Sequence, residues 1–393
     1  MQVCFFEDEA LSRFHPLTLT RPMDELRCGV LTLREKWLNH LETDRFTRAD
    51  RKPITDYYPV NPQPDTEDVI WINSRCLPDT ELAKKIRGLR DGQVIEVGGV
   101  SVAARTSTKD IRHTPDFTTL RKKQTDAGTL LTGAPDLFLK NGEQIAEDLR
   151  WMNSQRSSSA SISSHAILEE PDRIFLEAGA RIGPSAVIDA SGGPVVIQEG
   201  AEVMASSFVQ GPAVIGPGSV VKAGTRMYKE CTIGPVCKVG GELSNVIMQG
   251  YSNKAHDGYL GNSIIGEWCN LGADTTSSNL KNNYSLIHLR DWKTGENFNT
   301  GLQFCGTIMG DHTKTSINTM LNTGSQFGVS CNIIAGKFPP TFLPSFSWVG
   351  VDQVYVYRVE KALETARRIM QRRNIELTPD YENMLRQIFE QRE

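Results

Sequence analysis

Aliphatic residues recur at every sixth position in the second half of the chain. A first series starts at Leu176, and after a short insertion at 191–194 a second series runs unbroken from Ile197 to Val239. Four places after each position from Ile197 to Ile233, the residue is small. The repeat positions are Leu176, Ile182, Ile188, Ile197, Val203, Val209, Ile215, Val221, Met227, Ile233 and Val239, then Tyr259, Ile265 and Leu271, and finally Met309, Thr315, Leu321, Phe327 and Ile333.

A period of six fits neither an α-helix nor a single strand, but three such repeats make one turn of a triangular coil. The aliphatic residue fills the interior, the small residue occupies the corner, and successive turns stack about 4.8 Å apart. Eight successive matches in one phase argue against a β-sandwich with chance periodicity. We therefore predict a hexapeptide parallel β-helix over residues 166–345.

Residues 1–156 follow a different pattern, in which short β-rich runs alternate with stretches of helical spacing. The alternation predicts an α/β, Rossmann-like N-terminal domain with a largely parallel sheet. A serine-rich segment then predicts a linker at 157–165. The expected strands are Val3–Phe6, Val69–Asn73, Val94–Val97 and Val100–Ala104, and the expected helices are Leu31–Leu41 and Thr80–Leu89.

Beyond residue 345 the sixfold pattern gives way to helical spacing. The apolar residues from Val359 to Met370 predict one helix. Thr378-Pro379 is typical of an N-cap followed by proline at the first helical position, so a second helix should start there. We expect the helices of residues 346–393 to pack on the coil or on a neighbouring subunit.

The composition excludes several classes of protein. The 393 residues carry a net charge of −4, which argues against a nucleic-acid or anionic-membrane binder. No apolar run approaches the roughly 20 residues of a membrane helix, and the acidic N-terminal segment does not resemble a signal peptide. The eight cysteines lack CxxC spacing, so we expect buried packing thiols rather than a zinc ribbon or a disulfide scaffold. A cytoplasmic protein is expected.

The most informative segment, 253–282, interrupts the repeat. His256 and Tyr259 stand three residues apart, and Asn270 and Asn279 stand nine apart. With Lys254-Ala255 before the histidine and Leu271-Gly272-Ala273 after Asn270, the segment resembles the acetyltransferase domain of the bifunctional glucosamine-1-phosphate N-acetyltransferase/UDP-N-acetylglucosamine pyrophosphorylase family. Asp274 departs from the family's glycine. The resemblance implies a left-handed coil, acetyl-CoA as a substrate, and a homotrimer with acyl sites between coils.

The residue types suit this chemistry. Only the unprotonated amine of an amino sugar attacks a thioester, and neutral histidine accepts a proton at cellular pH. His256 is therefore the expected general base. The resemblance implies that Tyr259, Asn270 and Asn279 contact the sugar or its phosphate. The family's two phosphate-binding cations align with Tyr228 and Ser244 here, so Arg226, Lys254 and Lys281 are the candidate replacements.

The resemblance also places acetyl-CoA along the late coils. Backbone donors at Ile317 and Ala335 would bind its pantetheine arm, and Lys337 would lie near a CoA phosphate.

The N-terminal domain resembles sugar-phosphate nucleotidyltransferases, with substitutions at their key positions. The segment 13–22 matches the one that follows their glycine-rich loop, and 70–78 matches their strand that ends in a metal-binding aspartate. In this chain Glu7-Asp8-Glu9 replaces the glycines, Met23 replaces a lysine and Arg75 replaces the aspartate. We therefore expect a remnant of the nucleotide site, with Arg13, Arg21 and Arg75 as its cations and with Mg²⁺ and a nucleoside triphosphate bound only if the nucleotidyl step survives.

The sequence thus predicts an enzyme of amino-sugar nucleotide biosynthesis, an N-acetyltransferase that also carries a nucleotidyltransferase-like domain. Two alternatives remain open at this point: nucleotidyl transfer alone, and a non-catalytic scaffold that senses a sugar nucleotide. A γ-type carbonic anhydrase would need two closely spaced zinc-binding histidines, and His165, His256, His288 and His312 lack that pairing.

Overall fold

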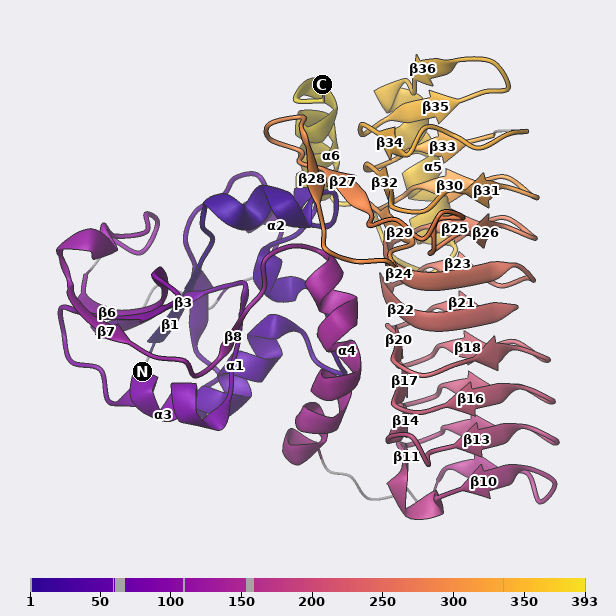
Figure 1. The fold of residues 1–393 in the computed structure, drawn as a ribbon, viewed down its shortest axis with the longest axis horizontal. Helices are drawn as coiled ribbons and strands as arrows, with labels where there is room; N and C mark the ends of the chain where they lie inside the picture. The colour runs from indigo at the N-terminus through magenta and orange to yellow at the C-terminus, as the bar shows by residue number, and fades with distance from the viewer. Residues whose placement is uncertain are drawn as a thin grey trace. The chain divides into compact units, whose positions relative to one another are not determined.

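The computed structural model describes residues 2–58, 60, 68–108, 110–152, 159–334 and 336–392 (Figure 1). Contacts between Cα atoms divide the chain into two compact units. The first unit consists of Met1–Phe14, Arg21–Leu26 and Leu31–Gly133, and the second of His15–Thr20, Arg27–Val30 and Ala134–Glu393.

The first unit is built on a mixed sheet with the strand order β2-β1-β3-β6-β5-β7. Strand β1 is parallel to β2 and β3, whereas β6 is antiparallel to both β3 and β5. The predicted largely parallel sheet is therefore wrong in this part, because Gly98 and Gly99, both with positive φ, join β5 and β6 in a tight hairpin. The strands are β1 (Gln2–Phe6), β2 (Phe46–Arg48), β3 (Asp68–Asn73), β4 (Cys76–Leu77), β5 (Gln93–Val97), β6 (Val100–Ser107), β7 (Arg121–Gln124) and β8 (Thr129–Leu130).

Helices α1 (Leu33–Leu41), α2 (Ile54–Tyr57) and α3 (Thr80–Arg87) belong to the same unit. Thr32 starts α1 with a capping box: its side chain accepts a hydrogen bond from the backbone N–H of Glu35, whose carboxylate binds the Thr32 N–H in return. The buried faces of α1 and α3 pack with the aliphatic side chains of β1 and β3 in one hydrophobic core.

The second unit is a left-handed β-helix whose turns stack along one axis (Figure 1). Its strands form a 13-stranded sheet, an 11-stranded sheet and short additional pairs. The predicted repeat residues point inward and are buried almost without exception. The 13-stranded sheet consists of β10 (Ile167–Glu169), β13 (Val187–Asp189), β16 (Phe208–Gln210), β19 (Arg226–Met227), β22 (Glu242–Gly250), β20 (Cys231–Ile233), β17 (Ala213–Ile215), β14 (Val195–Ile197), β11 (Ile174–Leu176), β24 (Tyr259–Glu267), β29 (Thr307–Met309), β32 (Ser325–Phe327) and β34 (Phe342–Leu343).

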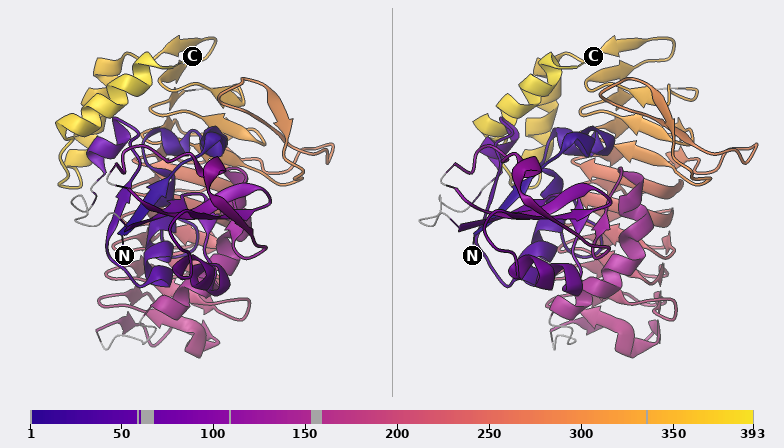
Figure 2. Two further views of the ribbon diagram at one scale, coloured as in Figure 1. Left: turned by 90° about the vertical axis from the view of Figure 1, so that its left-hand side faces the viewer. Right: turned by 60° about the vertical axis from the view of Figure 1, so that its left-hand side comes forward.

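The 11-stranded sheet forms another side of the coil, and a hairpin projects beside the late turns (Figure 2). The strands of this sheet are β9 (Ser161–Ile162), β12 (Arg181–Ile182), β15 (Glu202–Val203), β18 (Val220–Val221), β21 (Lys238–Val239), β23 (Asn253–Lys254), β25 (Asn270–Leu271), β30 (Lys314–Thr315), β33 (Asn332–Ile333), β35 (Ser347–Val349) and β36 (Val354–Val356). The shorter pairs are β26 (Thr276–Ser277) with β31 (Met320–Leu321), and β27 (His288–Arg290) with β28 (Asn297–Asn299) in the hairpin.

One repeat position is shifted by a residue from its prediction. Leu260, not Tyr259, continues the interior column, because Leu260 lies opposite Leu243 in the register of β22 and β24. Leu260 is fully buried, whereas Tyr259 is only half-buried and lies on the outer side of the strand. Six residues before Leu260, the interior position is taken by Lys254, which lies opposite Val239.

Three helices complete this unit: α4 (Pro135–Asp148), α5 (Val359–Gln371) and α6 (Pro379–Glu390). The first of them differs from the predicted domain boundary at 156, because α4 groups with the coil. Its Asn141 side chain donates to the carbonyl of Glu230 (2.8 Å) and accepts from the N–H of Gly29 (2.7 Å). These bonds join the helix and the segment Arg27–Val30 to the coil.

The C-terminal helices α5 and α6 lie beside the late turns of the coil (Figure 2). As predicted, the Thr378 side chain caps α6, accepting a hydrogen bond from the Tyr381 N–H. Tyr381 also approaches His312 of the coil (3.0 Å between Oη and Nε2), and Phe389 packs edge-on against Phe346. The helices of the described residues include none that is long and apolar enough to cross a membrane. All eight cysteines are buried and reduced, as expected for packing thiols.

Candidate functional site

His256 lies on the turn that leads from β23 to β24, at a corner of the coil. Its side chain is exposed, as are those of Asp257 and Asp274. The next turn of the coil stacks directly on this one: a Cβ atom on Gly258 would lie 2.3 Å from the carbonyl oxygen of Thr275. The predicted general base is therefore presented to solvent from a tightly stacked backbone.

Lys254 holds that turn from inside the coil. Its side chain is 1% exposed, and its Nζ atom donates to the carbonyl oxygens of Gly240 (3.1 Å), His256 (2.8 Å) and Asp257 (3.1 Å). Burial lowers the pKa of Lys254 to about 8, although the nearby carboxylates of Asp257 and Asp274 act in the opposite direction. This geometry favours a positioning role for Lys254 over the phosphate contact expected from the sequence.

Replacing Lys254 by methionine should lower the free energy of unfolding by roughly 1–3 kcal/mol, because buried carbonyl groups lose their donor. The folded-state pKa near 8 lies below the ordinary value of 10.5, so the unfolded chain binds more protons between these pH values. The contribution of Lys254 to stability therefore rises with pH in that window. Urea denaturation at pH 7 to 10 should show the difference between wild type and variant widening above pH 8.

The exposed Lys229 provides the control for this measurement. Lys229→Met should change stability by no more than about 0.5 kcal/mol at every pH. Equal effects of the two substitutions would contradict the role of Lys254.

Tyr259 and Asn279 form a hydrogen-bonded pair on the outer side of the coil. The Asn279 Nδ2 atom donates to the Tyr259 hydroxyl oxygen (3.0 Å) and to the Asn262 side-chain oxygen (2.7 Å). The Tyr259 hydroxyl hydrogen thus remains available to a ligand. Burial raises the pKa of Tyr259, so the phenol stays protonated at neutral pH. Gly261 leaves the space for this ring, since a Cβ atom there would lie 2.2 Å from the hydroxyl oxygen.

The other predicted substrate residues are distributed around the same turns. Asn270 is exposed on β25, next to Asn253 in the register of the sheet. Arg226 lies opposite Glu242 and forms an ion pair with it (3.2 Å), and Glu242 in turn lies opposite Tyr259. The Lys281 Nζ atom donates to the carbonyl of Leu286 (2.9 Å) and so fastens the base of the projecting loop.

The residues predicted to bind acetyl-CoA lie on the corner that carries His256. The turn at Asn318 stacks on that of Ala273 (2.8 Å from N–H to carbonyl), which stacks on the His256 turn. Ile317 is 68% exposed, and Lys337 is exposed on the following coil. Ala335 lies outside the described residues.

A groove of about 530 Å³ opens beside Asn262. Its size falls within the range of small-molecule sites, roughly 300–1,000 Å³. Since Asn262 accepts a hydrogen bond from Asn279, the groove adjoins the Tyr259–Asn279 pair. The lining residues are Leu139, Asn262, Leu286, Gly301, Leu302, Gln303 and Phe304.

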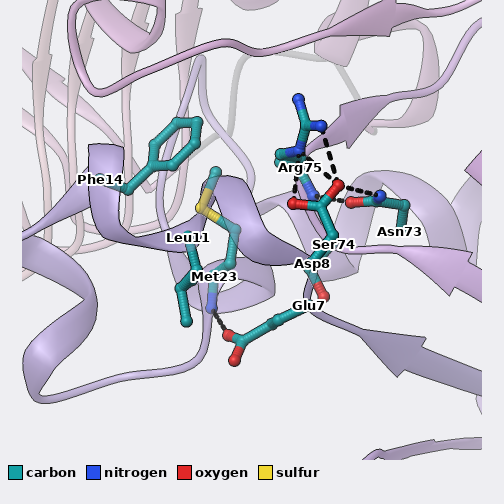
Figure 3. Close-up of a pocket in the computed structure, with 8 residues that line it drawn as sticks. All are labelled: Glu7, Asp8, Leu11, Phe14, Met23, Asn73, Ser74 and Arg75. Atoms are coloured by element: carbon teal, nitrogen blue, oxygen red, sulfur yellow. Dashed lines mark hydrogen bonds and ion pairs between the residues drawn. The ribbon is translucent and has the colours of Figure 1, made fainter. Parts of the chain in front are cut away.

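The remnant of the nucleotide site in the first unit is a narrow pocket of about 160 Å³ (Figure 3). The Arg75 guanidinium binds both carboxylate oxygens of Asp8 (2.8 and 2.9 Å) and donates to the carbonyl of Leu131 (2.7 Å). Burial would raise the pKa of Asp8, but the hydrogen bonds from Arg75 and Asn73 hold it below its usual range. The pocket is lined by Glu7, Asp8, Leu11, Phe14, Met23, Asn73, Ser74 and Arg75, so Arg13 and Arg21 are not among its lining residues.

Glu7, the other acidic residue in this pocket, is also engaged. One carboxylate oxygen accepts from the backbone N–H of Met23 (2.7 Å), and the other pairs with Arg51 (2.5 Å). Burial raises the pKa of Glu7 in spite of Arg51. Magnesium prefers oxygen ligands with spare charge. The carboxylates of this pocket are already neutralised by guanidinium groups and so do not fit a bound Mg²⁺ ion. No cluster of three or more metal-ligating side chains occurs in the described part of the chain.

Comparisons with known proteins agree with this division of the chain. Residues 3–157 match the family model of sugar nucleotidyl transferases. The bifunctional protein GlmU of Trichormus variabilis is 29% identical over 177 residues, or 44% of this chain and 34% of the relative. A bifunctional sugar-1-phosphate nucleotidylyltransferase/acetyltransferase of Sulfurisphaera tokodaii is 29% identical over 150 residues, or 37% of this chain and 36% of the relative. The chain thus spans about a third of the length of these relatives.

Among solved structures, UDP-N-acetylglucosamine acyltransferase from Campylobacter jejuni is 11% identical with a TM-score of 0.22, covering 59% of this chain and 95% of its own. The enzyme from Francisella novicida is 15% identical with a TM-score of 0.28, covering 57% and 75%. At these values the structural likeness carries no weight, and the assignment depends on the family model and the curated relatives. The chain belongs to a divergent GlmU-like branch of the sugar nucleotidyl transferases.

Proposed function

We propose that the coil transfers the acetyl group of acetyl-CoA to the amine of an amino-sugar 1-phosphate, with glucosamine 1-phosphate as the first candidate. The observation that carries the proposal is the exposed His256 turn. It is fastened from within by Lys254 and followed directly on β24 by the Tyr259–Asn279 pair. The names of the curated relatives, which include acetyltransferase, support the same chemistry.

In this mechanism neutral His256 accepts a proton from the amine as its nitrogen attacks the thioester carbonyl carbon. The bond between carbon and sulfur then breaks, CoA leaves as a thiol after gaining a proton, and the amide remains on the sugar. The Tyr259 hydroxyl, whose oxygen already accepts from Asn279, donates its hydrogen to an oxygen of the bound sugar. The stacked turns up to Ile317 and Lys337 provide the surface for the pantetheine arm and a CoA phosphate.

The test incubates the purified chain with glucosamine 1-phosphate, acetyl-CoA and each nucleoside triphosphate with Mg²⁺, and identifies the products by mass. We expect N-acetylglucosamine 1-phosphate and free CoA without any nucleotide. Omitting acetyl-CoA should abolish the product. Nucleotide-sugar formation with no acetylation would instead favour nucleotidyl transfer as the sole activity.

The proposed site also implies an assembly and a location. We expect a homotrimer in the cytoplasm, because the family builds its acyl sites between coils. Light scattering at micromolar concentration should then give three times the chain mass of 43.7 kDa. A monomer under these conditions would contradict the shared site.

A further inference from the structure

The three cations predicted to bind the sugar phosphate are already engaged. Lys254 and Lys281 donate to backbone carbonyls, and Arg226 is paired with Glu242. An amino-sugar phosphate carries at least one negative charge at its phosphate. The proposed function, on which this inference depends, therefore needs a cation elsewhere on the same turns.

Arg373 lies where such a cation is required. It follows α5, and its Nη2 atom donates to the side-chain oxygen of Asn253 on β23 (3.1 Å). The guanidinium forms no ion pair with any residue that the structure describes, and its side chain is partly exposed. Its backbone is fixed, since the Arg373 N–H donates to the carbonyl of Met370 (2.9 Å), which is 1% exposed.

The sheet under Arg373 presents a column of neutral and cationic side chains. Register pairs Lys238 with Asn253, Asn253 with Asn270, and Asn270 with Lys314. Each step is about 4.8 Å, so Arg373, Asn253 and Asn270 occupy a patch the size of a phosphate group and its ligands. Because Asn253 accepts from Arg373 through its oxygen, its NH₂ group is left to donate outward.

The charges along this turn change sign over a short distance. His256 follows Asn253 by three residues, which places the two within roughly 10 Å of each other. The carboxylates of Asp257 and Asp274 lie on the His256 side, and both act on the charge of Lys254. A ligand with an ammonium group and a phosphate would meet carboxylates at one end and a guanidinium at the other.

We propose that Arg373, together with Asn253, Asn270 and Lys238, binds a phosphate monoester, and that this is the phosphate of the acceptor sugar. A guanidinium forms paired, charge-assisted hydrogen bonds to phosphate oxygens, and the two amides and the lysine complete the set of donors. CoA also carries phosphates, so the test must separate the two sources.

The decisive variant is Arg373→Gln, with Arg372→Gln as the matched control. Arg372 is the exposed neighbour of Arg373 and forms no side-chain contact among the described residues. We expect Arg373→Gln to raise KM for glucosamine 1-phosphate at least tenfold. Its KM for acetyl-CoA and its acetylation of glucosamine without phosphate should stay within twofold of wild type. Arg373→Lys should restore part of the loss, and Arg372→Gln should match wild type.

Three results would overturn the proposal. One is an unchanged KM for glucosamine 1-phosphate in Arg373→Gln, and another is a rise in KM for acetyl-CoA alone, which would assign the patch to CoA. The third comes from calorimetric titration with glucosamine 1-phosphate: wild type that does not bind would refute the site. Binding that Arg373→Gln weakens, in a wild type that transfers no acetyl group, would keep this inference and reject the proposed function. Should Arg373→Gln fail to fold, Lys238→Gln on the exposed end of the column takes its place in the same measurements.

Discussion

Replacing His256 by alanine should lower acetyl transfer by roughly 10²–10⁴-fold, the usual contribution of a general base. The loss should fall on kcat, because the turn is held by Lys254 through backbone carbonyls and keeps its shape without the imidazole. Equilibrium binding of acetyl-CoA should stay within threefold, since the stacked turns near Ile317 are untouched.

The matched control for His256→Ala is His165→Ala. His165 is also an exposed histidine on the coil, close to Ser164 and far along the sequence from the candidate site. Its loss should leave kcat unchanged. Acetyl transfer by His256→Ala within threefold of wild type would remove His256 from the mechanism.

Pyrophosphate release from a nucleoside triphosphate and a sugar 1-phosphate should be at least 10³-fold below a typical turnover of about 10 s⁻¹. A triphosphate binds where backbone amides and cations converge. In this chain Asp8 and Glu7 take the place of the glycines, and Arg75 and Arg51 are engaged in neutralising them. Admitting a triphosphate would require breaking those ion pairs and placing carboxylates beside phosphate oxygens.

The measurement follows pyrophosphate with each of the four common nucleoside triphosphates and Mg²⁺, and a known nucleotidyltransferase serves as the positive control. Turnover near 10 s⁻¹ would show that the acidic loop rearranges and binds metal. It would also show that the family model matched over residues 3–157 carries its chemistry along with its fold.

The coil could be predicted almost residue by residue, because one requirement governs it. An interior that accepts one aliphatic side chain per strand imposes a period that survives from Ile197 to Val239, and the structure buries every one of these positions. The exception at Tyr259 occurs where the longer turn at 255–258 precedes β24, so simple counting from Ile265 gives the wrong residue.

Features that depend on contacts distant in sequence could not be predicted in this way. Gly98-Gly99 was a local signal for a hairpin, and weighing it would have corrected the direction of β6. The attachment of α4 to the coil depends instead on Asn141, which bonds to residues about 90 and 112 positions away. Arg373 was missed for the same reason, because the sequence of α5 indicates a packing helix and gives no sign that its end meets Asn253.

Each turn of the β-helix contacts only the turns above and below it, and this separates length from chemistry. The turns between Leu176 and Val221 precede the one that contributes Lys238 and contain none of the residues assigned to the acyl site except through stacking. Adding or removing a whole turn among them would translate the site along the axis without changing its geometry. The early turns act as a ruler that evolution or a protein engineer can lengthen, while the catalytic turns keep their shape.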